Sequence, residues 1–179
     1  MKSEDISRRS FLKRAAALSA AAAIPSFWIP SKANAMPGVP FVSANEKVRI
    51  AFIGIGNRGG EIAQELYKTG LCEVVALCDV DMGAPHTQKL ISMFPKVPRF
   101  QDFRQMFDKM ADKIDAVTVG VPDHAHFPIT IEAMAHGKHV YVEKPMARTF
   151  QEIEVMMRAE KKFGVVTQMG NQGHSEANY

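Results

Sequence analysis

Short apolar runs alternate with segments that carry apolar residues at helical spacing from residue 48 onward. The runs are bounded by glycine, proline or aspartate and predict buried strands at 48–53, 74–78, 97–100, 116–119, 139–142 and 165–169. The segments between them predict helices at 60–69, 84–94, 103–110, 127–136 and 150–163. This alternation is typical of an α/β fold. We expect a doubly wound, Rossmann-type parallel sheet with helices on both faces.

The predicted helices begin and end at residues that suit those positions. Asp102 can cap the helix that follows it, and Pro128 falls in a first turn, where a missing backbone N–H costs little. Glycines come directly after three of the helices, at Gly70, Gly137 and Gly164, where a left-handed residue commonly ends a helix.

Composition and charge narrow the class of protein. The chain has 179 residues, of which 46% are hydrophobic and 23% charged, as in an ordinary globular protein of about one domain. The formal net charge is +3, but residues 1–35 hold six of the 22 basic side chains and only two of the 19 acidic ones. The remainder is close to neutral, which argues against nucleic acid as a partner.

The first 35 residues carry the features of an export signal. Arg8 and Arg9 precede an alanine-rich stretch over 15–24, and the small-x-small pattern Ala33-Asn34-Ala35 follows. This order resembles a twin-arginine signal, which implies export by the twin-arginine machinery to a periplasmic or membrane-associated location. A basic amphipathic helix on a membrane surface is the alternative. We therefore divide the chain into a signal (1–35), a linker (36–46), a mature domain (47–174) and the start of a crossover (175–179).

The cysteine pattern predicts neither a disulfide nor a metal site. Cys72 and Cys78 fall in one predicted strand, where an extended chain of six residues spans about 20 Å. A disulfide needs Cα atoms within about 7 Å. The sequence also lacks the Cys/His spacing of a structural zinc site.

A glycine-rich turn follows the first predicted strand. Its sequence, Gly54-Ile55-Gly56-Asn57-Arg58-Gly59, fits G-x-G-x-x-G and is followed twenty residues later by Asp79 at the end of the next strand. This arrangement predicts a dinucleotide site in which Gly54 makes a tight turn, Gly56 lets the pyrophosphate approach and Gly59 packs helix against strand. Asn57 and Arg58 are included among the cofactor-binding residues. A glycine-rich turn without a ligand is the alternative.

Asp79 bears on the choice of cofactor. Its carboxylate would accept hydrogen bonds from the adenosine ribose and repel a 2′-phosphate, which favours NAD over NADP. Arg58 could instead reach a phosphate, and Asp79 could be a loop carboxylate or a helix cap.

Two further motifs follow strands, Pro122-Asp123-His124-Ala125-His126 and Glu143-Lys144-Pro145. With the glycine turn, they make residues 47–174 resemble the Gfo/Idh/MocA family of oxidoreductases. The resemblance implies a Rossmann domain followed by a second, sheet-rich domain. It also implies hydride transfer between a secondary alcohol of a sugar or cyclitol and NAD or NADP.

The resemblance also assigns roles to residues. Glu143 is expected beside the nicotinamide ribose, and Lys144 is expected to contact cofactor and substrate and to act in catalysis, with the Lys144-Pro145 peptide in the cis form. Pro122, His124 and His126 would line the ribose pocket, although either histidine could cap the next helix instead. Asn171 would contact nicotinamide or substrate, and His174 the sugar. The alternative for Lys144 is a surface lysine without a role in catalysis. The alternative for the segment after residue 169 is a mobile loop.

The family's second domain is not found in the chain, so we expect a fragment that lacks part of the catalytic machinery and is inactive alone. The sheet face that the second domain normally covers would be exposed in this chain, which favours association, and a homo-oligomer is expected of the full-length form. Two alternatives to a dehydrogenase remain: a glycosidase or lyase of the same family that cycles a bound NAD, and a non-catalytic dinucleotide-binding module. A valine commonly replaces the motif lysine in that glycosidase branch, so Lys144 favours the dehydrogenase.

Overall fold

The computed structural model describes residues 47–174. The predictions for the signal, the linker and the start of the crossover concern residues outside this part. None of the helices within 47–174 is both long and apolar enough to cross a bilayer.

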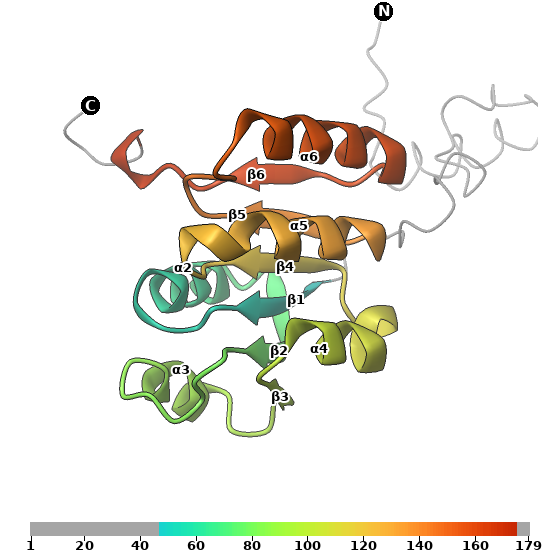
Figure 1. The fold of residues 1–179 in the computed structure, drawn as a ribbon. Coiled ribbons are helices and arrows are strands. Elements are labelled where there is room, and N and C mark those ends of the chain that lie inside the picture. The colour runs from blue at the N-terminus through green and yellow to red at the C-terminus, as the bar shows by residue number, and fades with distance from the viewer. Residues whose placement is uncertain (1–46, 175–179) are drawn as a thin grey trace, which may run out of the picture. The chain divides into compact units, whose positions relative to one another are not determined.

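Six parallel strands form one sheet in the order β3-β2-β1-β4-β5-β6. All their arrows point the same way in Figure 1, so their carboxyl ends meet at one edge of the sheet. The expected Rossmann-type sheet is thereby confirmed. The strands are β1 Val48–Ile53, β2 Cys72–Cys78, β3 Arg99–Phe100, β4 Ala116–Val119, β5 His139–Val142 and β6 Thr167–Met169.

Five α-helices connect the strands. They are α2 Asn57–Lys68, α3 Gln88–Met93, α4 Phe103–Met110, α5 His126–Ala135 and α6 Phe150–Phe163. The predicted bounds hold for α6, and the predicted stops at Gly70, Gly137 and Gly164 all have positive φ, between 63° and 71°. Asp102 caps α4 as expected, because its side chain accepts a hydrogen bond from the Arg104 N–H at 2.9 Å.

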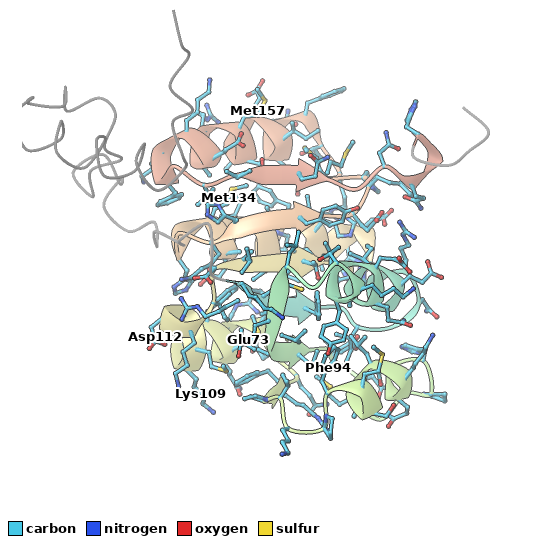
Figure 2. The ribbon with its side chains drawn as sticks, turned by 180° about the vertical axis from the view of Figure 1, so that it is seen from behind. Glu73, Phe94, Lys109, Asp112, Met134 and Met157 are labelled. Atoms are coloured by element: carbon cyan, nitrogen blue, oxygen red, sulfur yellow. The ribbon has the colours of Figure 1, made fainter. Side chains whose placement is uncertain are left out.

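The side chains of the sheet alternate between two apolar layers. On β1, Ala51 and Ile53 pack with α4, α5 and α6, whereas Ile50 and Phe52 pack with α2 and α3. Figure 2 shows one labelled residue in each layer, Phe94 beside α3 and Met134 on α5. Helices thus lie on both faces of the sheet: α4, α5 and α6 on one face, and α2 and α3 over β1 and β2 on the other.

Three predicted elements are shorter in the structure, one of them the strand predicted from residue 165, which begins at Thr167. The helix predicted from residue 84 begins at Gln88, because residues 82–87 form turns held by side chains: the Asp81 carboxylate accepts from the Gly83 N–H, and the Thr87 hydroxyl donates to the Ala84 carbonyl. The strand predicted from residue 97 begins at Arg99, after Pro98, which has no N–H to donate.

The order of the strands reverses at the neighbouring strands β1 and β4: β2 and β3 lie on one side of β1, whereas β4, β5 and β6 lie on the other. In an open α/β sheet, ligands bind beyond the carboxyl ends of the strands at such a switch point. A ligand site is therefore expected at the β1–α2 and β4–α5 connections, which lie at this switch point.

Candidate functional site

The glycine turn between β1 and α2 has the conformation that the sequence predicts. Gly54 has φ +79°, and a Cβ there would lie 2.6 Å from the Gly120 carbonyl carbon. A Cβ on Gly59 would overlap with the Gly54 carbonyl oxygen and lie 2.9 Å from that of Gly120. Gly54 and Gly59 thus allow the β1–α2 turn to sit against the end of β4. Asn57 has φ 42°, a left-handed conformation that asparagine tolerates better than most residues.

Gly56 lines a cavity and differs from Gly54 and Gly59 because the three atoms nearest to its missing Cβ all belong to a side chain. The cavity has a volume of about 660 Å³, within the range of small-molecule sites. Seven of the predicted residues line it: Gly54, Gly56, Asn57, Arg58, Asp79, Pro122 and His124. A Cβ on Gly56 would overlap with His86 Cδ2 and lie 2.8 Å from His86 Nε2.

Asp79 holds the wall of this cavity together. One carboxylate oxygen accepts a hydrogen bond from the Ile55 N–H at 2.9 Å, and the other accepts from the Asp81 N–H at 3.0 Å. Each oxygen retains a further lone pair for a ligand hydroxyl. The side chain therefore anchors the loop and keeps capacity to accept further hydrogen bonds.

Arg58 forms ion pairs with Glu61 and with Glu143. Its Nε lies 3.3 Å from Glu143 Oε1, and its Nη1 lies 3.1 Å from Glu61 Oε2. Burial alone would lower the pKa of Arg58, but the hydrogen bonds to Glu61 and Glu143 outweigh it and raise the pKa. Arg58 thus joins the start of α2 to the end of β5.

Glu143 is almost fully buried, with 4% of its surface exposed. Besides Arg58, it accepts a hydrogen bond from the Lys144 N–H at 3.2 Å. A Cβ on Gly170 would lie 2.6 Å both from Glu143 Oε1 and from the Tyr141 hydroxyl. Burial, followed by the nearby Glu143 carboxylate, raises the pKa of Tyr141. The β5 end is therefore a polar cluster joined to the glycine turn through Arg58.

Lys144, Asn171 and His174 are exposed and lie outside the cavity lining. Lys144 follows β5 directly, and the Lys144-Pro145 peptide is cis, as predicted. Asn171 follows β6, whose neighbour in the sheet is β5. The three residues thus lie beyond the same sheet edge as the cavity, on the side of β5 and β6.

His126 has a different role from the one expected. It is 1% exposed, and its ring nitrogens lie 2.6 Å from the Pro145 carbonyl oxygen and 2.8 Å from that of Val121. Both nitrogens are thus occupied by backbone, so the side chain neither lines a ribose pocket nor caps α5. It holds the β4–α5 connection against the turn that carries Lys144.

Sequence reasoning missed two members of the site, His86 and Tyr141. His86 comes from the turns before α3, where no periodic pattern marks it, whereas Tyr141 stands two residues before Glu143 and so shares its side of the strand. Among residues 47–174, no group of three or more His, Cys, Asp or Glu side chains could hold a metal ion.

A glycine cradle at the switch point, a cavity that ends at Asp79 and a buried carboxylate beyond the next strands fit a dinucleotide. Together they define a Rossmann-type dinucleotide-binding domain. The family model described as "Oxidoreductase family, NAD-binding Rossmann fold" (GFO_IDH_MocA) matches residues 48–171. The chain therefore belongs to the Gfo/Idh/MocA family of NAD-binding oxidoreductases.

Some of the individual relatives are named as glycosidases and others as dehydrogenases. An alpha-N-acetylgalactosaminidase of Shewanella oneidensis is 30% identical over 164 residues, which cover 83% of this chain and 35% of that protein. A myo-inositol 2-dehydrogenase structure from Lactobacillus plantarum is 25% identical, with a TM-score of 0.65 over 75% of this chain and 39% of the other. The chain spans about a third of the length of the curated relatives it matches.

A WlbA dehydrogenase from Thermus thermophilus, solved with NAD and UDP-GlcNAcA, has the same fold. It is 21% identical with a TM-score of 0.65, and the match covers 73% of this chain and 43% of that one. At this identity the likeness concerns the fold alone.

Proposed function

We propose that the chain is the cofactor-binding part of an exported, NAD-dependent dehydrogenase that oxidises a secondary alcohol of a sugar or cyclitol. The observation that carries the proposal is the position of Lys144. It is exposed, directly follows β5, and stands beside Glu143, which Arg58 ties to the glycine turn. A cationic side chain thus lies next to the cofactor site and remains free to meet a substrate.

Bound NAD would supply the hydride acceptor. Arg58 and the Lys144 N–H orient the Glu143 carboxylate, and its remaining lone pairs would accept hydrogen bonds from the nicotinamide ribose. The Lys144 ammonium would donate to the reacting hydroxyl and help its proton leave. It would also stabilise the negative charge that grows on that oxygen as the C–H bond breaks.

Replacing Lys144 tests this role. In the natural polypeptide, Lys144→Met should leave NAD affinity unchanged, because the glycine turn and Asp79 hold the dinucleotide. Reduction of NAD by a panel of sugars and cyclitols should slow by about 10²–10⁴-fold, the usual effect of losing a positioned proton-transfer group. Lys113→Met is the matched control, since this exposed lysine lies at the opposite end of the sheet, just before β4. Equal rates in wild type and Lys144→Met would remove the lysine from the mechanism.

A glycosidase that cycles a bound NAD is the second candidate, and the similarity to the Shewanella glycosidase favours it. The two activities differ in their products. A dehydrogenase accumulates reduced NAD and oxidised sugar, whereas a redox-cycling glycosidase releases the aglycone of a nitrophenyl glycoside with no net reduction. Aglycone release without reduced NAD would replace the first candidate with the second.

Export is part of the proposal and is supported by the order of elements in residues 1–35. A twin-arginine route carries folded proteins, which would let the domain acquire NAD before export. Changing Arg8 and Arg9 to lysine should retain the precursor inside the cell, as cell fractionation would show. Unaltered export would contradict this assignment.

A further inference from the structure

We propose that His86 is an additional binding residue that donates a hydrogen bond to the pyrophosphate of the dinucleotide. This inference rests on the dinucleotide site proposed above. His86 lies far from the glycine turn in the sequence, yet its imidazole packs directly on Gly56. The three atoms nearest to a Cβ on that glycine all belong to the His86 ring. In a glycine turn of this type, the second glycine is where the backbone approaches the pyrophosphate.

The segment that presents His86 is held by several side-chain hydrogen bonds. Asp81 accepts from the Gly83 N–H at 3.0 Å, and the fully buried Thr87 donates to the Ala84 carbonyl at 2.8 Å. Gln88 Nε2 donates to the Met82 carbonyl at 2.8 Å. The residues on both sides of His86 are thus fixed, which presents its imidazole to Gly56.

The charged side chains around the cavity do not themselves neutralise a phosphate, so a further hydrogen-bond donor would contribute to binding. Asp79 and Asp81 line the cavity and oppose a phosphate, while the Arg58 guanidinium is held by the carboxylates of Glu61 and Glu143. Within residues 47–174, no hydrogen bond or ion pair is formed by the His86 ring; His86 lines the same cavity, and its Nε2 lies 2.8 Å from the place of a Cβ on Gly56. A diphosphate at Gly56 would take hydrogen bonds from the start of α2 and a further one from His86.

The test uses ligands that differ only in their phosphates. Calorimetry with NAD, ADP and adenosine is performed on the wild-type chain, His86→Ala and His86→Gln. His136→Gln serves as the control that removes an imidazole elsewhere, at the end of α5. His86→Ala should weaken NAD and ADP by about 10–100-fold, the range for a hydrogen bond to a charged group, and leave adenosine unchanged. His86→Gln keeps an N–H donor and should recover part of the loss.

Three results would overturn the assignment. Equal loss for adenosine and ADP would move the contact to the nucleoside. Unchanged NAD affinity in His86→Ala would remove the residue from the site. Tighter binding in that variant would make His86 an obstruction rather than a ligand. If the folded wild type binds neither NAD nor ADP, the dinucleotide site itself fails, and this result is distinct from a failure at His86 alone.

Discussion

The variants Gly56→Ala and Gly59→Ala should separate the effect of the glycine turn on NAD affinity from its effect on the stability of the fold. On Gly56 the new methyl would meet only the exposed His86 ring among its nearest atoms, and that ring can rotate away at a cost of about 0.5–1.5 kcal/mol. The fold should therefore survive with stability within about 1.5 kcal/mol of wild type. The methyl would still stand where the pyrophosphate approaches, so NAD affinity should fall by about 10–100-fold, equivalent to an overpacking cost of 1–3 kcal/mol.

Gly59 gives the opposite expectation. Its Cβ would overlap with the backbone oxygen of Gly54 and lie 2.9 Å from that of Gly120, and neither can rotate away. The helix-propensity gain of alanine, about 1 kcal/mol, is outweighed, and we expect a net destabilisation of about 1–3 kcal/mol. Gly173→Ala is the control for stability, because no heavy atom lies within 4 Å of its Cβ.

Urea unfolding followed by circular dichroism measures the first quantity, and calorimetry with NAD measures the second. Adding His86→Ala to Gly56→Ala should remove the small loss of stability without restoring affinity. The reasoning is refuted if Gly59→Ala is as stable as wild type, or if Gly56→Ala binds NAD normally.

Three further predictions concern the scaffold. Asp115, whose carboxylate accepts three hydrogen bonds from Arg49, has a lowered pKa: burial alone would raise it, but these bonds outweigh burial. Its contribution to stability is therefore present above the unfolded-state pKa and lost as pH falls through the folded-state value. Asp115→Asn should cost about 1–3 kcal/mol at pH 7 and flatten the acid limb of a urea stability profile; an unchanged acid limb would contradict this. Burial, then the carboxylates of Asp79 and Asp102, raises the pKa of Cys78 to about 12, so iodoacetamide should label this thiol only after unfolding, and labelling of the native protein would count against it. Thr149 and Glu152 form a capping box at the start of α6, so Thr149→Ala should lower the free energy of unfolding by about 1 kcal/mol in urea titrations. An unchanged free energy of unfolding would contradict the role of this cap.

The fold was predictable wherever the spacing of apolar residues and the glycines that end helices indicated the same element bounds. Helix α6 has its predicted bounds because a long periodic run ends at Gly164, which adopts the left-handed conformation that stops a helix. The predicted start of α3 was wrong because the helix is delayed by two side-chain hydrogen bonds: the Asp81 carboxylate accepts from the Gly83 N–H, and the Thr87 hydroxyl donates to the Ala84 carbonyl. A pattern of apolar positions cannot contain that information.

The site was predictable to the extent that backbone position determines it. Gly56 and Asp79 lie in one cavity because each follows a strand at the same edge of the sheet. His126 was misassigned because a motif places a residue after a strand without showing which way its side chain points; both ring nitrogens turn inward to carbonyl oxygens. His86 was missed because its proximity to Gly56 exists only in three dimensions.

Calorimetric titration of the folded chain with NAD and NADP tests the central claim most directly. The glycine turn, the cavity and Asp79 predict one-to-one binding of NAD and weaker binding of NADP, whose 2′-phosphate would meet the Asp79 carboxylate. Asp79→Ser should narrow the difference between the two cofactors. Failure of the folded chain to bind either cofactor at about 1 mM, roughly −4 kcal/mol, would contradict the account.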